Sequence, residues 1–479
     1  MLMGVAFVPV YLRVLGIEAY GLIGFFLSLQ VFFAVLDMGL SATLNRELAR
    51  HRHSGSDADA QRDLVRTLEW LYWPTGLLIA VGVFALSGFI AAHWLHPVRL
   101  STGETAHAIA LMGVSAGLQW PCGFYAGGFR GLERQVALNG LNAFFATLRH
   151  GGVALVLLYL APTLEAFLYW QIGVSTLQTM ASGAYLWWLL PTGNRAPEFR
   201  LQRLREVQGF ALSLAAIAAL SFVLTQSDRL LLATLLPLDE LGYYTLAATL
   251  AAALSTVALP FVAALYPRYS GLVAAGEDEK LRLLYRQSTQ LLVVVLASAA
   301  AVVVFFSADL LRLWTHNLRI ASNSGVILSI LVTGTALNGL LSLPYALQLA
   351  HGRTRLALVM NIVSVLFVVP AIWWLGSRYG GPGAAAVWVA LNLAYVAIGV
   401  PLMHRQVIAI GMRDWYLRDV LPPALSAVAV AAALRLAVPT LPDGPWGVVL
   451  FCAIAGMVLL VAALSAPAAR TILQRRPLA

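Results

Sequence analysis

One arginine stands in the middle of a long apolar stretch of this sequence, at Arg149. If the stretch is a membrane-spanning helix, the guanidinium lies roughly 15 Å from either end at about 1.5 Å per residue. A cation at that depth needs a partner or a water-filled cavity. A planar guanidinium can hold a phosphate or diphosphate through paired hydrogen bonds, so we interpret Arg149 as an anion-binding group that faces a central cavity. An ion pair between helices is the alternative.

A second charged pair, Asp228 and Arg229, follows the polar residues Thr225, Gln226 and Ser227 in another apolar stretch. Neighbouring residues on a helix diverge by about 100°, so these two cannot both face one partner. Asp228 could be a coupling-ion or proton site, or a counter-charge for Arg149. Arg229 could contact the substrate or extend toward the outer surface.

Asp37 ends an earlier apolar stretch, and Arg46 follows it between two and three helical turns later. This pair predicts either a gate element at the cytoplasmic side or a simple ion pair at a helix end.

Polar residues step by three or four along two further apolar stretches, so each set shares one helix face. The two sets are Ser115, Gln119, Cys122 and Tyr125, and Asn338, Ser342, Tyr345 and Gln348. Such a stripe is either hydrogen bonding between helices or the wall of a cavity, and we favour a wall that contacts the substrate. Pro121 and Pro344 should interrupt the two helices and mark places where they bend.

The elements that carry these residues are membrane-spanning helices. Of the 479 residues, 60% are hydrophobic and 11% are charged, which is too apolar for a soluble core. We therefore predict an all-α polytopic membrane protein with about fourteen spans. Their approximate centres are Val10, Phe32, Leu78, Gly117, Gly151, Gly173, Ala219, Leu254, Val302, Ala336, Phe367, Asn392, Val428 and Ala455.

The sequence also repeats itself at an offset of 221 to 223 residues. Leu15, Glu18 and Gly21 correspond to Leu236, Asp239 and Gly242, and Pro121 and Arg130 correspond to Pro344 and Arg353. This predicts two six-helix lobes, residues 1–207 and 208–405, related by an axis along the membrane normal, and two additional helices in 406–479. By the same register the first helix starts late, so we expect it to be truncated; a short interfacial helix is the alternative. Arg149 corresponds to Ile372, which makes the positive charge one-sided.

The distribution of basic residues predicts that both termini are cytoplasmic, because the loops placed inside hold 23 of the 31 Lys and Arg residues. The net charge of +9 then reflects topology and attraction to anionic lipids, without a nucleic-acid partner. The sequence has no metal-ligand cluster, nucleophile elbow or glycine-rich phosphate loop, so we expect neither a cofactor nor an enzyme. Cys122 and Cys452 lie within apolar spans and predict no disulfide.

Several short segments resemble bacterial polysaccharide biosynthesis proteins, the oligosaccharide-lipid flippases of the multidrug/oligosaccharidyl-lipid/polysaccharide exporter superfamily. The resemblance covers about the first 400 residues. The segments are 11–21 (YLRVLGIEAYG), 36–40 (LDMGL), 45–49 (NRELA), 131–135 (GLERQ), 227–231 (SDRLL) and 242–243 (GY).

This resemblance implies that the chain moves an undecaprenyl-diphosphate-linked oligosaccharide across the bacterial inner membrane by alternating access, for surface polysaccharide or O-antigen biosynthesis. It implies basic residues in a central cavity, where Arg149 fits. The expected partners are the lipid-linked oligosaccharide, membrane lipids, a coupling ion (H⁺ or Na⁺) and other membrane proteins of polysaccharide assembly. A multidrug or cation antiporter of the same superfamily is the alternative, ahead of a peptidoglycan-precursor flippase and a membrane glycosyl-polymerase or ligase.

Overall fold

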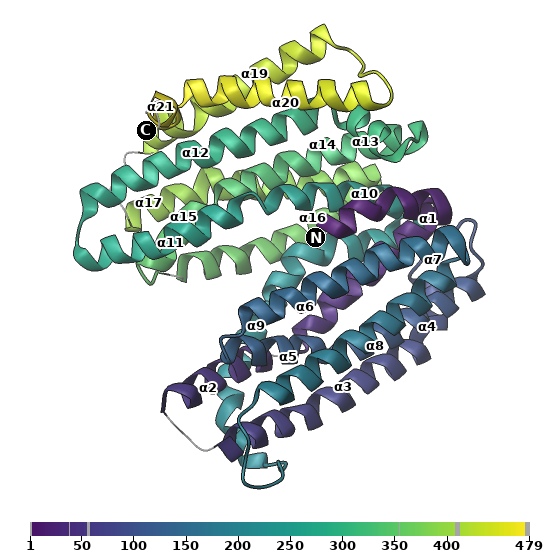
Figure 1. Ribbon diagram of the computed structural model, residues 1–479. Helices are drawn as coiled ribbons and strands as arrows, with labels where there is room; N and C mark the ends of the chain where they lie inside the picture. Colours follow the sequence, from purple (N-terminus) through teal and green to yellow (C-terminus); the bar gives the residue numbers. More distant parts are fainter. Residues whose placement is uncertain (1, 38, 55–57, 354, 408–411, 475–479) are drawn as a thin grey trace. The chain divides into compact units, whose positions relative to one another are not determined.

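The regular structure of the chain is helical, as the apolar stretches predict. The computed structural model describes residues 2–37, 39–54, 58–353, 355–407 and 412–474. In these residues every named element is a helix, and one isolated β-bridge joins His96 to Pro237. The chain divides into two compact units, Met1–Gly242 and Tyr243–Ala479, which are described separately (Figure 1).

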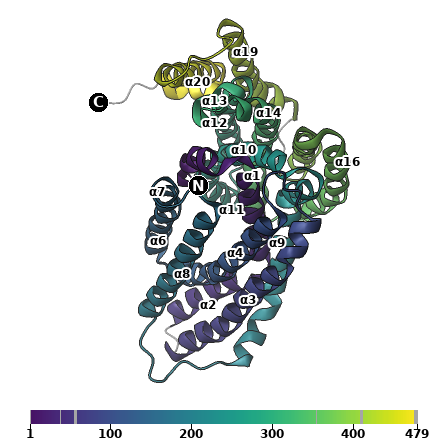
Figure 2. The same cartoon turned by 90° about the vertical axis from the view of Figure 1, so that its right-hand side faces the viewer.

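The first unit contains nine α-helices and one π-helical turn. They are α1 (Leu2–Val35), α2 (Leu40–Ser54), α3 (Ala58–His93), α4 (Thr102–Gln119), α5 (Pro121–Gly131), α6 (Gln135–Thr147), η1 (Leu148–Gly152), α7 (Val153–Tyr159), α8 (Leu164–Leu189) and α9 (Leu201–Leu235). Helix α4 packs between α3 and α8, and the three run alongside one another (Figure 2).

Helix α10 runs across the division, and the second unit contains the helices that follow. They are α10 (Leu238–Ser255), α11 (Ala258–Ala275), α12 (Asp278–Phe305), α13 (Ser307–Thr315), α14 (Leu318–Leu340), α15 (Ser342–Ala350), α16 (Arg355–Ala394), η2 (Tyr395–Gly399), α17 (Val400–Val407), α18 (Met412–Asp414), η3 (Trp415–Val420), α19 (Leu421–Ala437), α20 (Pro445–Ser465) and α21 (Pro467–Gln474).

All fourteen predicted span centres lie in helices. Within the described residues, nine helical ranges are long and apolar enough to cross a membrane, so the chain is a multi-pass membrane protein. The longest of these ranges, Arg355–Val407, has 53 residues and contains two of the predicted centres. The number of crossings stays a prediction.

The predicted internal repeat has a counterpart in the interruptions of the helices. Trp120 separates α4 from α5, and 221 residues later Leu341 separates α14 from α15. Pro121 begins α5 and Pro344 lies in the first turn of α15, so both helices are interrupted where the prolines predict. The two compact units divide after Gly242, so the first unit includes all of α9. The repeat instead assigns most of α9 to the second lobe, which is predicted to begin at residue 208. The lobe boundaries 207/208 and 405/406 stay predictions.

Close contact between α3 and α4 depends on glycine. A Cβ atom on Gly76 would lie 2.5 Å from the carbonyl oxygen of Gly117, which no real contact allows. The two helix backbones therefore meet where neither residue has a side chain. Small residues at such crossings are the usual means of packing helices in a membrane. This crossing fixes one side of the helix that carries the first polar stripe.

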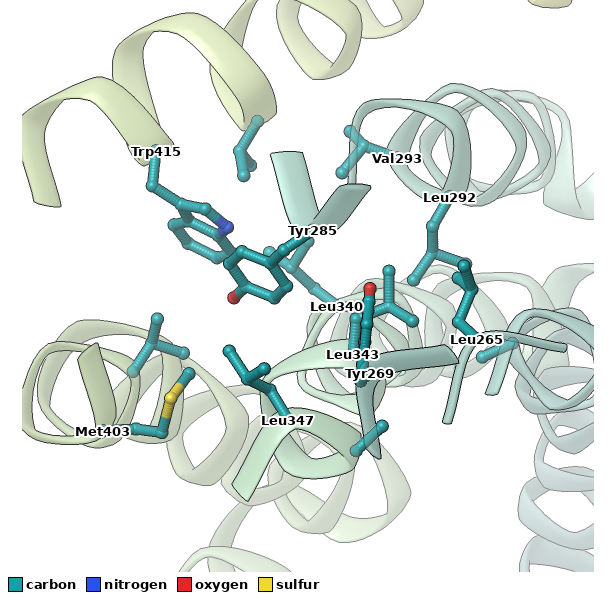
Figure 3. Close-up of a cluster of buried hydrophobic side chains, with 14 of the residues drawn as sticks. Leu265, Tyr269, Tyr285, Leu292, Val293, Leu340, Leu343, Leu347, Met403 and Trp415 are labelled. Atoms are coloured by element: carbon teal, nitrogen blue, oxygen red, sulfur yellow. The ribbon is translucent and has the colours of Figure 1, made fainter. Parts of the chain in front are cut away.

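The core of the second unit is rich in aromatic side chains near the start of α12. Figure 3 shows Tyr285, Trp415 and Met403 directed toward a common centre, with Tyr269 and several leucines beside them. Tyr285 Oη lies 2.9 Å from His404 Nε2, and the His404 ring packs edge-on against Trp415, with ring centroids 5.4 Å apart. These contacts join α12 to the segment that leads into α19.

Candidate functional site

Arg149 lies on the π-helical turn η1, which interrupts the helical run from α6 to α7. Its guanidinium points toward α8. Nη1 donates to Gln171 Oε1 at 2.9 Å and to Ser175 Oγ at 3.1 Å, and Nη2 donates to Gln178 Oε1 at 2.9 Å. The acceptors follow one another at steps of four and three along α8, so they form one stripe on that helix. We call these four residues the Arg149 cluster.

The charge of Arg149 is balanced by neutral oxygens only. Within the described residues no carboxylate lies within 4.0 Å of this guanidinium, so the ion pair considered as an alternative is not formed there. Asp228 is not among its hydrogen-bond partners. Amide and hydroxyl dipoles can solvate a cation without cancelling its charge. The cluster therefore retains a net positive charge that an anionic ligand could neutralise.

A cavity of about 310 Å³ lies in the same unit, between α1 and the junction of α4 with α5. We call it the polar cavity. It is lined by Gln30, Phe33, Ala34, Asp37, Ser41, Ala116, Gln119, Trp120, Cys122 and Gly123. Cys122 Sγ lies 2.9 Å from Thr179 Oγ1, one residue after Gln178. The wall of the cavity is thus bonded to the helix that supplies the acceptors of the Arg149 cluster.

Asp37 lies in the polar cavity, and its partners differ from the predicted pair. Its carboxylate accepts hydrogen bonds from Tyr72 Oη and from Ser41 Oγ, the latter at 2.8 Å. Arg46 bonds instead to Glu47, at 2.7 Å. The helix-end ion pair between Asp37 and Arg46, one of our two interpretations, is therefore absent from the described contacts of Asp37. A gate role for either residue stays a prediction.

The first polar stripe both lines a cavity and makes hydrogen bonds between helices. Gln119 and Cys122 line the polar cavity, and Gln119 Oε1 accepts from Gln30 Nε2 at 2.9 Å. Ser115 and Tyr125 are buried instead. Ser115 Oγ lies 3.3 Å from Ser175 Oγ, and Tyr125 donates to Glu69 Oε1 at 3.0 Å. All four residues therefore bond to other helices, and two of them, Gln119 and Cys122, also form part of the cavity wall.

The second stripe is more dispersed. Asn338 Nδ2 donates to Asn392 Oδ1 at 2.8 Å, which joins α14 to α16. Gln348 is buried, whereas Tyr345 is half-exposed, and Ser342 has intermediate exposure. The break at Leu341 divides the four residues between α14 and α15, as the break at Trp120 divides the first stripe between α4 and α5, so neither set lies on one helix as predicted. Their predicted role in contacting substrate remains untested.

Asp228 and Arg229 lie on α9, each with intermediate exposure. Ser227 beside them is buried. Their predicted roles in coupling and in substrate contact stay predictions.

Sequence reasoning missed the three acceptors of the Arg149 cluster. Gln171, Ser175 and Gln178 form a polar stripe on α8 with the same spacing that identified the other stripes. Thr179 adds a fourth polar position beside them. The signal was therefore present, but it has no counterpart in the other half of the repeat that would have drawn attention to it.

A second and larger cavity, about 870 Å³, opens on the surface of α3 and α4. Its lining is almost entirely apolar and includes Trp70, Leu77 and Phe84, with Arg66 and Glu69 at one end. Arg66 bonds to Glu69 at 3.0 Å. In the described part of the chain, no group of three or more His, Cys, Asp or Glu side chains is placed to hold a metal ion.

The family model described as polysaccharide biosynthesis protein matches residues 1–273, more than half of the chain. The chain belongs to this family. A second model, MatE, matches residues 214–374. A Shigella flexneri protein named "Putative O-antigen transporter" is 19% identical over 379 residues, which are 78% of this chain and 87% of that protein.

Two solved structures share the fold. One is the lipid II flippase MurJ in an inward closed conformation, with a TM-score of 0.72, 12% identity and 96% of each chain covered. The other is an inward-facing multidrug resistance transporter of the MATE family, with a TM-score of 0.65, 14% identity, and coverage of 84% of this chain and 95% of that one. At these identities the likeness concerns the fold alone. It places this chain in the architecture that these transporters share.

Proposed function

We propose that this protein is a flippase that moves an undecaprenyl-diphosphate-linked oligosaccharide across the bacterial inner membrane by alternating access, for surface polysaccharide or O-antigen assembly. The membership of the polysaccharide biosynthesis family supports the substrate class. So does the match to a protein named as an O-antigen transporter, over 87% of its length.

The single observation that carries the proposal is that the hydrogen-bond acceptors of the Arg149 guanidinium, in the described residues, are neutral groups. A guanidinium held by two amide oxygens and one hydroxyl keeps its positive charge and still has N–H donors that these three bonds do not use. A diphosphate presents several anionic oxygens that match such donors. In this proposal Arg149 binds the diphosphate, and the polar cavity beside Gln119 takes the first sugars.

Of the predicted site residues, Asp37 and Asp228 remain candidates for coupling to H⁺ or Na⁺ because each offers a carboxylate at or within an apolar stretch that is predicted to span the membrane. Membrane lipids and other proteins of polysaccharide assembly remain the proposed partners, and both termini are proposed to be cytoplasmic. We also maintain that the chain is not an enzyme, in keeping with relatives that are named as transporters and flippases.

The experiment that tests the function is mass spectrometry of lipid extracts from cells depleted of this protein. A flippase defect should cause an undecaprenyl-diphosphate oligosaccharide to accumulate with its repeat unit intact on the lipid carrier. Re-expression of the wild-type chain should restore the pool to its normal size. An unchanged lipid-linked pool in depleted cells would rule the proposal out.

A multidrug or cation antiporter is the second candidate, favoured by the MatE match over residues 214–374. It would need a carboxylate that binds a cation, for which Asp228 and Asp37 are the candidates; Asp37 lines the polar cavity. Increased drug sensitivity of depleted cells, with normal lipid-linked oligosaccharides, would favour this candidate over the flippase.

A further inference from the structure

Two side chains from other helices donate hydrogen bonds to backbone carbonyls of the π-helical turn that carries Arg149. In a π-helical turn the backbone bonds run from residue i to i+5, so one extra residue is accommodated and nearby carbonyls lose their ordinary α-helical partners. Leu148 and His150, which flank Arg149, belong to this turn. The Leu148 carbonyl accepts a hydrogen bond from a side chain, and the His150 carbonyl accepts one from a side chain in addition to the backbone N–H of Val153.

Trp170 of α8 supplies the first donor. Its Nε1–H donates to the carbonyl oxygen of Leu148 at 3.1 Å. The ring lies where a Cβ atom of Gly152 would be, so the absence of a side chain at Gly152 admits the indole. Trp170 lies one residue before Gln171, the first acceptor of the Arg149 cluster. The same stretch of α8 thus holds both the backbone and the guanidinium.

Tyr11 of α1 supplies the second donor. Its hydroxyl donates to the carbonyl oxygen of His150 at 3.2 Å and lies 3.3 Å from Nδ1 of the same residue. The Tyr11 side chain is only 4% exposed, and its ring packs edge-on against Phe167. A buried hydroxyl at this position has no water to replace these bonds, so their loss would leave the His150 carbonyl with one partner fewer.

We propose that Tyr11 and Trp170 are positioning residues for anion binding: they hold the π-helical turn and thereby direct the Arg149 guanidinium toward α8. This inference rests on the proposed function of Arg149. If the turn relaxed to α-helical bonding, the register of the helix would change by one residue, which is a rotation of about 100°. Arg149 would then leave its acceptors on α8.

The test uses the full-length protein purified in nanodiscs, with inorganic diphosphate as the probe and isothermal titration as the measurement. The variants are Tyr11→Phe and Trp170→Phe, which each remove one N–H or O–H donor and keep an aromatic ring. Arg149→Ala removes the cation. Tyr159→Phe is the matched control, because Tyr159 ends the same helical run with its side chain 79% exposed.

We expect the Kd for diphosphate to rise on the order of 3- to 10-fold in each of Tyr11→Phe and Trp170→Phe, as for the loss of one hydrogen bond. Binding should be lost in Arg149→Ala and unchanged in Tyr159→Phe. If these hydrogen bonds only stabilise the fold, their loss in Tyr11→Phe or Trp170→Phe should lower the thermal midpoint and leave the Kd of the folded protein for diphosphate unchanged. The two variants act on different carbonyls, so if one fails to fold the other still tests the inference.

Two outcomes would count against the inference, and they differ. If Arg149→Ala loses binding while Tyr11→Phe and Trp170→Phe bind like the wild type, the positioning role is wrong and the anion role of Arg149 stands. If Arg149→Ala binds diphosphate as well as the wild type does, the anion role itself is wrong, and the positioning role is wrong with it.

Discussion

Two arginines, Arg286 in the second unit and Arg149 in the first, differ in the groups that accept their hydrogen bonds. In the second unit, Arg286 makes a two-bond ion pair with Asp419, at 2.8 and 3.2 Å, and Asp309 pairs with both Arg435 and Arg312. In the first unit, Arg149 has only neutral acceptors. The pairs Arg286–Asp419 and Arg435–Asp309 join different helices, whereas the proposal assigns the positive charge of Arg149 to a ligand.

The paired arginines attach the last two predicted spans to the rest of the second unit. Asp419 also accepts from Gln290 of α12 at 2.7 Å, while Asp309 accepts from the backbone N–H of Leu441 at 3.1 Å. Between these two attachments α19 and α20 run beside α12 (Figure 1). Apolar side chains of the three helices are buried together there. The C-terminal helices are thus bound at both ends of α12, and the charged groups there are satisfied by the protein itself.

The largest effect should come from Arg149. Arg149→Ala should lower transport at least about 100-fold, because the charge that the proposal assigns to diphosphate binding is lost. Thermal stability should stay the same or rise, since an unmatched cation in a low-dielectric interior is costly. Arg149→Lys should recover only part of the transport, because a lysine lacks the planar pair of donors. Wild-type transport by Arg149→Ala, measured by the lipid-linked pool, would contradict the assignment.

Removal of the carboxylate charge from the Arg286–Asp419 ion pair should lower stability and leave diphosphate binding unchanged. Asp419→Asn leaves Arg286 without its counter-charge in a site where the Asp419 side chain is fully buried. We expect the free energy of unfolding to fall by about 3 kcal/mol, seen as a lower thermal midpoint in detergent. The diphosphate affinity of the protein that remains folded should be unchanged. A normal midpoint, or a selective loss of affinity, would show that this pair does not have the structural role assigned to it.

An arginine–carboxylate ion pair like that of Arg286 with Asp419 can also be introduced at Arg149. Gln178→Glu replaces an acceptor of Arg149 with a carboxylate of the same shape and would turn the cluster into an ion pair. We expect the Kd for diphosphate to rise about 10-fold or more, because the ligand must then compete with an internal anion. Gln406→Glu, on an exposed side chain, is the control for the added negative charge. Equal affinities in both variants would contradict the idea that an unmatched charge is what binds.

The smallest effect is expected for an exposed pair. Lys280 bonds to Glu277 at 2.8 Å, but the Lys280 side chain is 72% exposed. Lys280→Gln should change the free energy of unfolding by less than about 0.5 kcal/mol, because water and salt screen such pairs. A comparison of the thermal midpoints of Lys280→Gln and Asp419→Asn would show whether the burial of an ion pair, or its presence alone, determines its contribution to stability. A shift as large as that of Asp419→Asn would favour mere pairing.

The sequence predicted where helices are interrupted, but it did not predict which side chains of a polar stripe are buried. Pro121 and Pro344 identified the interrupted helices because proline removes a backbone donor wherever it lies in a helix. Spacing placed Ser115, Gln119, Cys122 and Tyr125 on one face, although the break at Trp120 divides them between α4 and α5. Spacing did not separate Gln119 and Cys122, which line the polar cavity, from Ser115 and Tyr125, which do not, because burial depends on which helices pack on each side.

The pairing of charges shows the same limit. Asp37 and Arg46 are close in sequence, yet Asp37 bonds to Tyr72 from another helix. Asp419 and Arg286 are 133 residues apart, and nothing in their local patterns relates them. Local spacing reports which residues share a helix face, whereas ion pairs between helices depend on contacts distant in sequence.

By itself, the sequence determined that this is a multi-pass helical membrane protein with interruptions at two prolines and a charge buried at Arg149. These follow from apolar length, backbone chemistry and the cost of charge in hydrocarbon, which are local properties. Only the tertiary structure decided that Arg149 has neutral acceptors on α8, that a π-helical turn carries it, and that the C-terminal helices are attached at both ends of α12. The reason is physical: whether a buried charge is matched depends on the side chains that other helices bring to it.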